Sequence, residues 1–189
     1  MGCLVGVPTL MTKRLKLRGF SHGDIADVVR LAGDIEIARM TLLVPHPYET
    51  RDAEVWISSH EAAFNEGKSA EFAITLHDGT LIGAIAIVFS KQHERAEIGY
   101  WIGVPFWGKG YATEAASEIV RYGFEDRGQA RLTAHHFAHN PASGRVIEKI
   151  GMKREGLFPK HVKKWGEFVD CVMYGMLRED WRTAPPGLR

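Results

Sequence analysis

Residues 98–115 read IGYWIGVPFWGKGYATEA, a stretch that combines a strand, a turn and the beginning of a helix. The apolar run at its start favours a strand, and Gly108 and Gly110 favour a turn that opens directly into a helix. Such a junction leaves backbone N–H groups unpaired at the positive end of the helix dipole, where phosphate groups bind. The stretch therefore predicts a phosphate-binding loop built from main-chain donors.

Two glycines alone are also compatible with a simple tight turn, so the surrounding residues decide between the two interpretations. The loop lacks the Lys-Ser or Lys-Thr pair of the Walker motif and the third glycine of the dinucleotide-binding fingerprint. Both of those nucleotide-binding folds are therefore disfavoured.

The chain of 189 residues is 45% hydrophobic and 25% charged, which is typical of one soluble globular domain. Its formal net charge of +1 gives no basis for predicting nucleic-acid or membrane partners. The two cysteines, Cys3 and Cys171, favour neither a disulfide framework nor a zinc site, and they fit a reducing, cytoplasmic compartment. A short basic cluster is interpreted as a solvated loop; it comprises Lys160, His161, Lys163 and Lys164.

No apolar run approaches the length of a membrane-spanning helix, and the N-terminus lacks the features of a signal peptide. Met11 stands directly before the first patterned segment and is as good a start as Met1. We therefore expect residues 1–11 to be a flexible extension, residues 12–182 to form a single domain, and residues 183–189 to be a tail.

Patterning along the chain predicts strands and helices without repeats or linkers. About seven strands are expected, at residues 13–17, 70–76, 81–89, 96–102, 131–138, 152–158 and 167–177. Helical spacing of apolar residues predicts helices from residue 25 and over 49–64, 108–127 and 140–150. Asp78-Gly79 predicts a hairpin between the second and third strands. This order predicts a mixed α/β (α+β) fold, with a mostly antiparallel sheet and helices on both faces.

The junction resembles the loop of the GNAT superfamily of acyl-CoA dependent N-acetyltransferases, which reads R/Q-x-x-G-x-G/A before a long helix. Trp107 stands where Arg or Gln is usual, a departure that leaves the backbone donors intact. The resemblance is closer to the ribosomal-protein N-terminal acetyltransferase branch, and its marks span residues 12–182. They are residues 14–18, 97–102, 108–115, 140–143 and 145–152, with Asp170 and Tyr174.

The resemblance implies a GNAT fold and direct transfer of an acetyl group from acetyl-CoA to a primary amine, in a ternary complex without a metal. A protein N-terminal amine is the first acceptor to consider. A small amine, such as an aminoglycoside, a polyamine or an amino-acid derivative, is the alternative, and a non-catalytic acyl-CoA binding module is the rival from another class. A monomer and a homodimer both remain open.

The resemblance also implies which residues contact the cofactor. The expected set comprises Ile102, Val104, Trp107, Gly108, Lys109, Gly110, Tyr111, Ala112, Thr113, Asn140, Ser143 and Arg145. Ile102 and Val104 are expected to offer backbone groups to the pantetheine arm, as a neighbouring strand would. Asn140 is equally suited to be only the N-cap of its helix, and Arg145 is equally suited to be a solvated side chain.

Two residues are expected to be catalytic, namely Glu97 and Ser143. Glu97 shares a strand face with Gly99 and Trp101, and we expect it to take the amine proton directly or through water. Its apolar neighbours favour a raised pKa, whereas an ordinary polar position or an ion pair is the alternative. The resemblance implies that Ser143 protonates the CoA thiolate, because Ile147 replaces the tyrosine that many superfamily members use; solvent is the alternative source of this proton.

The remaining expectations concern the histidines and the acceptor. His135 and His136 should point to opposite faces of a strand, which disfavours a shared metal, and His139 should lie at the rim of the site. Acceptor contacts are expected from the segments 40–48 and 159–167.

Overall fold

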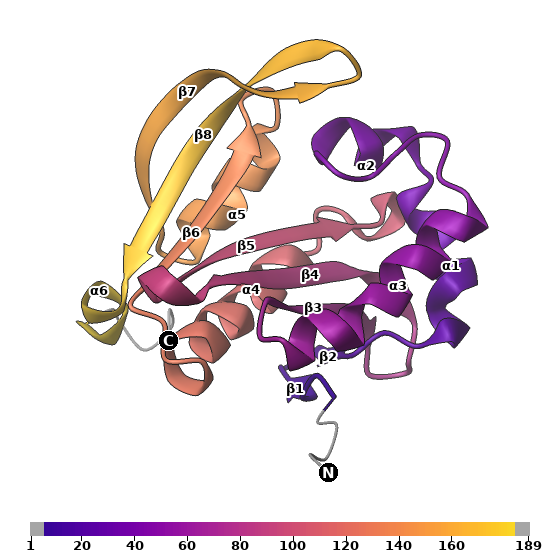
Figure 1. Cartoon of the computed structure of the whole chain (residues 1–189), viewed down its shortest axis with the longest axis horizontal. Coiled ribbons are helices and arrows are strands. Elements are labelled where there is room, and N and C mark those ends of the chain that lie inside the picture. The colour runs from indigo at the N-terminus through magenta and orange to yellow at the C-terminus, as the bar shows by residue number, and fades with distance from the viewer. Residues whose placement is uncertain (1–5, 184–189) are drawn as a thin grey trace.

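The structure is a computed structural model in which residues 6–183 are described. Eight strands of this part of the chain form one sheet in the order β1-β2-β3-β4-β5-β6-β8-β7 (Figure 1). They are β1 (Leu10–Met11), β2 (Leu15–Arg18), β3 (Ser69–Leu76), β4 (Leu81–Ser90), β5 (Arg95–Ile102), β6 (Arg131–Phe137), β7 (Lys153–Lys164) and β8 (Glu167–Leu177). Every neighbouring pair is antiparallel except β5 and β6, which are parallel. The predicted mixed, mostly antiparallel sheet is confirmed.

Strand β1 was not predicted from the sequence. It lies inside the segment that was expected to be an N-terminal extension. Leu10 pairs with Leu17 of β2 and is only 8% exposed, so its side chain belongs to the core. The sheet therefore begins before residue 12. Residues 1–5 and 184–189, which hold much of the predicted extension and tail, lie outside the described residues.

Helices cover both faces of the sheet, as predicted (Figure 1). One face packs against α1 (Ile25–Ala32) and α3 (Thr50–Asn65), and the other against α4 (Tyr111–Arg121) and α5 (Pro141–Lys149). The sequence did not predict two short helices, because six residues are too few to show an apolar period. These are α2 (Ile35–Met40) and α6 (Arg178–Thr183).

Two segments differ in length from their predictions. The helix predicted to reach residue 127 continues beyond α4 as a π-helical turn over Tyr122–Asp126. Strand β7 continues to Lys164, past the predicted end at residue 158, and forms with β8 a long hairpin that projects beyond the rest of the sheet (Figure 1). Among residues 6–183, no helix is both long enough and apolar enough to cross a membrane.

The parallel strands β5 and β6 pair only over a short distance before they diverge. Their register runs from Arg95↔Arg131 to Glu97↔Thr133 and stops there. The N–H of Gly103 donates to Ile82 of β4, so alternation along β5 directs the backbone groups of residues 98, 100 and 102 toward β6 instead. Beyond Glu97, β5 therefore has a free edge that faces the diverging strand.

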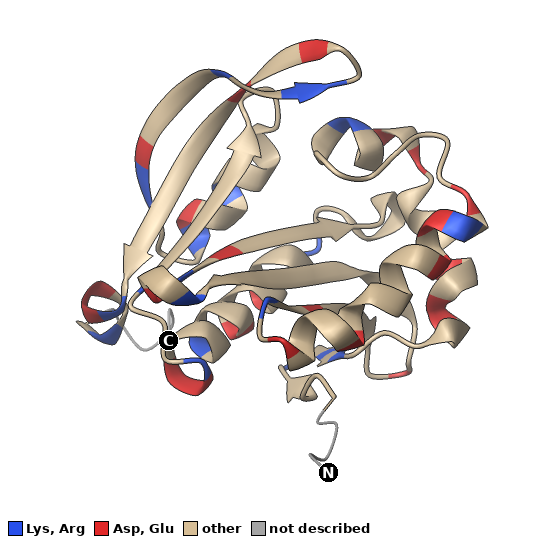
Figure 2. Cartoon of the chain, in the orientation of Figure 1, with Lys and Arg blue, Asp and Glu red and all other residues tan. Residues whose placement is uncertain are grey.

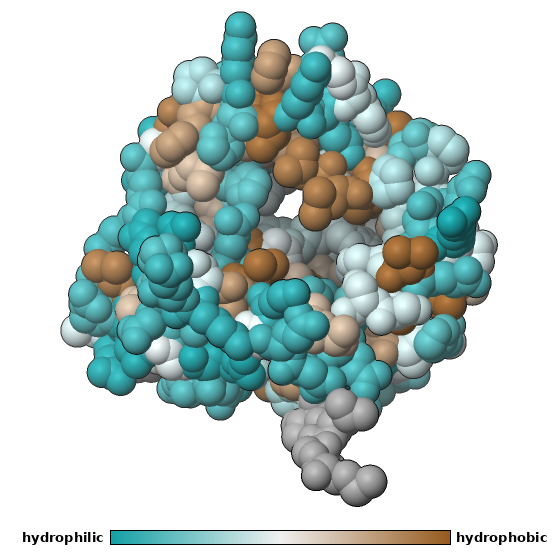
Figure 3. All heavy atoms as spheres, in the orientation of Figure 1, coloured by the Kyte–Doolittle hydropathy of each residue, from teal (hydrophilic) through white to brown (hydrophobic). Residues whose placement is uncertain are grey.

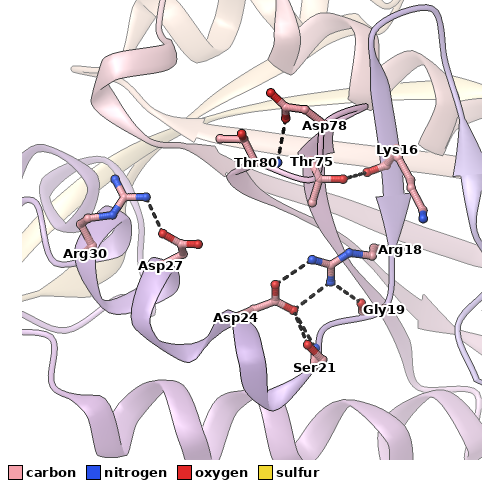
Figure 4. Close-up of polar contacts among 10 residues, drawn as sticks. All are labelled: Lys16, Arg18, Gly19, Ser21, Asp24, Asp27, Arg30, Thr75, Asp78 and Thr80. Atoms are coloured by element: carbon pink, nitrogen blue, oxygen red, sulfur yellow. Dashed lines mark hydrogen bonds and ion pairs between the residues drawn. The ribbon is translucent and has the colours of Figure 1, made fainter.

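A buried ion pair joins the end of β2 to the start of α1 (Figure 4). Arg18 donates from Nη2 to Asp24 Oδ1 at 2.7 Å and from Nη1 to Oδ2 at 2.8 Å. The N–H of Ser21 also donates to Oδ2, at 2.8 Å, and Asp24 is 6% exposed. Burial pushes the pKa of Asp24 upward, but the hydrogen bonds from Arg18 and Ser21 outweigh it and leave the pKa lowered.

Replacing Asp24 by Asn should lower the free energy of unfolding by roughly 2 kcal/mol at neutral pH, because the Arg18 guanidinium loses its charged partner. The lowered pKa means that this stabilisation is present above the unfolded-state pKa of about 3.9 and is lost as pH falls through the folded-state pKa. The difference between wild type and D24N should therefore shrink below about pH 4. Urea unfolding at several pH values measures both effects.

The matched control is Asp27→Asn, one helical turn further on in the same region (Figure 4). Asp27 pairs with Arg30 at 2.6 Å, but its side chain is 47% exposed. Exposed pairs contribute little, so this variant should cost less than about 0.5 kcal/mol. Equal losses in the two variants would contradict the importance of the buried pair.

Candidate functional site

The predicted phosphate-binding loop lies between β5 and α4. Gly108 and Gly110 have positive φ angles of 74° and 79°, which favour glycine. Among the described residues, the N–H groups of residues 108–113 have no partner, whereas the N–H of Glu114 donates to Gly110. A Cβ added at Gly108 would meet nothing within 4 Å, so the loop is open there. Unpaired backbone N–H groups therefore lie just before α4 and in its first turn, which is the arrangement that an anion-binding site requires.

The side chain of Arg14, near the N-terminus, contacts this loop and the first turn of α4. Arg14 donates from Nη1 to the carbonyl of Lys109 at 2.9 Å and from Nε to Glu114 Oε2 at 2.6 Å. Its guanidinium also lies over the Tyr111 ring, 4.7 Å from the centroid. Burial raises the pKa of Glu114, but hydrogen bonds from Thr12 and Arg14 outweigh it and leave the pKa lowered. Sequence reasoning missed this role of Arg14, because nothing local links it to residues about a hundred positions away.

Four predicted cofactor residues lie between the end of β5 and the loop: Ile102, Val104, Trp107 and Lys109. The indole Nε1–H of Trp107 donates to the carbonyl of Ile102, and its backbone N–H donates to Val104 at 3.2 Å. Both N–H groups of Trp107 therefore donate to carbonyl groups of the residues just before it. The N–H of Ile102 remains on the free edge of β5. Lys109 donates from Nζ to Pro105 at 3.1 Å, so its ammonium also lies at the loop.

The start of α5 contacts β5 beside the free edge. Asn140 caps the helix, because its Oδ1 accepts from the N–H of Ser143 at 3.2 Å. The Ser143 hydroxyl lies 2.9 Å from the Tyr100 hydroxyl, which also donates to the Ser143 carbonyl at 3.2 Å. Burial raises the pKa of Tyr100 to about 12. Tyr100 is thus a site residue that the sequence did not single out, and Arg145 lies on the exposed side of the same helix.

Glu97 lies on the other face of β5, which it shares with Gly99 and Trp101 as predicted. Its Oε1 is 2.9 Å from Nδ1 of His135 on β6. This hydrogen bond outweighs burial and lowers the pKa of Glu97. The expectation of a raised pKa is therefore wrong, because apolar sequence neighbours in a strand point to the opposite face.

The two adjacent histidines of β6 point to opposite faces, as predicted. His136 is 8% exposed, and its Nε2 would lie 2.7 Å from a Cβ added at Gly144 of α5. His135 instead contacts Glu97 on the other face. Within residues 6–183, no three histidine, cysteine or acidic side chains are grouped as a metal site would require.

A pocket of ≈ 240 Å³ lies between α2, the end of β6 and the β7–β8 hairpin. Its lining is largely apolar, with two basic residues and one carboxylate; it comprises Arg39, Met40, Phe137, His139, Lys164, Trp165, Glu167 and Val169. Figure 3 shows apolar side chains around an opening in this face, and Figure 2 shows charges of both signs on α2 and the hairpin. His139, which is expected at the rim of the active site, is one of the residues that line this pocket.

One lysine brings the two predicted acceptor segments together. Lys164 is 9% exposed and donates from Nζ to the carbonyls of Leu42 at 3.1 Å and Val44 at 2.7 Å. Burial lowers its pKa. The interpretation of the basic cluster as a solvated loop holds only in part. Lys160, His161 and Lys163 are exposed, but the segment is the end of strand β7 and Lys164 packs inward.

Replacing Lys164 by Met should loosen segment 41–48, since the two carbonyls lose a charged donor while the side-chain volume is retained. We expect hydrogen exchange of the amides in this segment to accelerate about 10-fold, as measured by mass spectrometry. Lys163→Met is the matched control, because Lys163 is exposed and lies over the Phe168 ring. The same acceleration in both variants would contradict a specific role of Lys164.

Comparisons with known proteins agree with this geometry. Residues 14–153 match the family model of the acetyltransferase (GNAT) domain. The chain is 34% identical over 174 residues to the uncharacterized N-acetyltransferase YnaD of Bacillus subtilis (strain 168), covering 91% of this chain and 98% of that one. A GNAT-family acetyltransferase from Bacillus anthracis has a TM-score of 0.81 at 28% identity and covers 91% of this chain and 99% of its own. RimL, a ribosomal L7/L12 alpha-N-protein acetyltransferase in complex with coenzyme A, shares the fold with a TM-score of 0.82 at 16% identity, over 90% and 98% of the chains.

Proposed function

Since the chain belongs to the GNAT acetyltransferase family, we propose that it transfers an acetyl group from acetyl-CoA to a primary amine by direct attack in a ternary complex. One observation carries this proposal. The unpaired N–H groups of residues 108–113 lie beyond the C-terminal end of β5. The free edge of β5 runs from this end back toward Glu97. A phosphate site and an open strand edge are thus joined in one continuous surface.

Acetyl-CoA matches both parts of this surface. Its pyrophosphate suits the N–H donors at the start of α4, where the Gly108 and Gly110 backbones allow close approach. Its pantetheine amides suit the outward backbone groups of Tyr100 and Ile102, which would pair with them as with another strand. Ile102, Val104 and the loop residues 107–113 therefore remain our proposed cofactor contacts, with Asn140, Ser143 and Arg145 on α5.

The chemistry requires a neutral amine and a proton for the departing thiolate. Ser143 lies beside the free edge and is our proposed donor of that proton, because Tyr100 holds its hydroxyl at 2.9 Å. Glu97 and His135 lie on the other face of the strands, toward the side that carries α1 and α3. The amine would approach from that face, opposite the helix that begins at the loop.

A protein N-terminal amine is our proposed acceptor. The motifs at residues 97–102 and 140–152 resemble the ribosomal-protein branch, and the similarly folded RimL is named for such a substrate. The pocket between α2 and the hairpin supports an amine with an adjoining apolar group, as at the first residues of a peptide. The lining contains two basic residues, Arg39 and Lys164, and a single carboxylate, that of Glu167, which disfavours a polyamine or an aminoglycoside. A small amino-acid derivative fits the same lining and is the second candidate.

With acetyl-CoA, the protein should release thiol in the presence of short peptides with free N-termini or leucine amide, and far less with spermidine or an aminoglycoside. We expect this preference because the lining of the pocket is largely apolar and has more basic than acidic residues. Thiol release and mass identification of the acetylated product measure this. If no amine in the panel raises thiol release above hydrolysis while CoA still binds, the chain is an acyl-CoA binding module instead.

Replacing Ser143 by Ala should lower kcat roughly 10- to 100-fold, because the thiolate then depends on water for its proton. The KM for acetyl-CoA should change little, since backbone groups supply most of the proposed contacts. Steady-state thiol release measures both constants, and Ser58→Ala on the exposed side of α3 is the control. An unchanged kcat in S143A would exclude Ser143 as the proton donor.

A further inference from the structure

The pairing of β5 with β6 ends at a pair of titratable side chains. Glu97 is the last residue of β5 in register with β6, opposite Thr133, and His135 lies two residues further along β6 on the same face as Thr133. Glu97 Oε1 and His135 Nδ1 are 2.9 Å apart. The two side chains are 47% and 26% exposed, so a ligand can reach them. The pair thus bridges the point where the strands separate.

The role of this pair rests on the proposed function, because its position is defined relative to the proposed cofactor. The phosphate-binding loop lies just beyond the C-terminal end of β5, and the free edge leads from it back to residue 98. An extended arm anchored at the loop therefore has its reactive end near the point of separation. Phe137, the next residue on the His135 face of β6, lines the pocket beside α2, so an amine in that pocket lies on the same face.

We propose that His135 takes the proton from the attacking amine through Nε2, and that Glu97 is the positioning residue that holds its ring. A carboxylate that accepts the Nδ1–H bond fixes the tautomer in which Nε2 carries the lone pair. Among the described residues, no protein group hydrogen-bonds Nε2 of His135. That nitrogen is therefore available to a ligand.

Direct proton transfer to Glu97 is less favourable. The hydrogen bond from His135 lowers the pKa of Glu97, with smaller contributions in the same direction from Arg95 of β5 and His161 of β7. On β8, burial and the nearby charges of Asp170 and Glu97 raise the pKa of the Cys171 thiol. A carboxylate with a lowered pKa is a weak base, but it stabilises an adjacent imidazolium.

The proposed step conserves atoms and charge. The ammonium of the acceptor gives one proton to His135 Nε2, and the neutral nitrogen then attacks the thioester carbon. The new C–N bond forms and the C–S bond breaks, and the thiolate takes the hydroxyl proton of Ser143. The attacking nitrogen loses its second proton as the amide forms, and that proton returns to Ser143 through water. The imidazolium afterwards returns its proton to water, so one proton is released in each turnover.

The test compares His135→Ala, Glu97→Gln and the control His22→Gln, with acetyl-CoA and a short peptide with a free N-terminus as probes. H135A should lose about 100-fold in kcat with little change in the KM for acetyl-CoA, and added imidazole should restore part of it. E97Q should lose about 10-fold in kcat, because the His135 ring then lacks the carboxylate that holds it in place. H22Q should stay within about twofold of wild type, since His22 is exposed, lies just before α1 and is not part of the proposed site.

The contrary result is a loss in E97Q at least as large as in H135A, without rescue of H135A by imidazole; Glu97 would then be the base. A second measurement is independent of turnover. Nitrogen NMR of the neutral imidazole of His135 in the wild-type protein should show a protonated Nδ1 and a bare Nε2, and the opposite tautomer would overturn the proposal. A protein that acetylates no amine refutes the proposed function, whereas the tautomer still decides the role of Glu97.

Discussion

Hydrogen bonding between β5 and β6 stops after Glu97 and Thr133, and the rest of the candidate site depends on that ending. Backbone N–H and C=O groups are strong hydrogen-bonding groups, and leaving one unpaired in a dry interior costs about 1–3 kcal/mol. The free edge of residues 98–102 can therefore persist only where water or an extended ligand reaches it. An arm with amide groups at strand-like spacing satisfies the same donors and acceptors.

Long-range contacts hold both ends of this surface. At the loop end, the Arg14 and Glu114 pair joins the first turn of α4 to the chain before β2. On the acceptor side, the Lys164 ammonium joins the hairpin to the segment after α2 through two carbonyls. Hydrogen bonds to a charged group are stronger than neutral ones, and those of Lys164 are also partly shielded from water, whereas those of Arg14 are exposed. The order of both loops thus comes from tertiary contacts in addition to local turn preferences.

Features that depend on local patterning were predictable from the sequence. Strand β8 has its predicted bounds, since its apolar and β-branched residues form a clear run, and Gly108 and Gly110 lie in the predicted turn before a helix. Contacts between distant segments were not predictable. The roles of Arg14, Tyr100 and His135 arise only when the sheet places them beside Glu114, Ser143 and Glu97. The pKa of Glu97 failed as a prediction for this reason, because its environment is set across strands and not along one.

The two-residue period of β5 separates the two proton-transfer tasks of the proposed reaction. Strands β4 and β5 pair from Gly83↔Ile102 to Ser90↔Arg95 without a register shift, so the alternation along β5 is unbroken. Tyr100 consequently points to the face of α5 and Ser143, and Glu97 points to the face of His135. A slip of one residue would exchange these faces and place each side chain among the wrong partners. The continuous pairing with β4 on one side therefore allows the other side of β5 to remain open while its side chains stay in place.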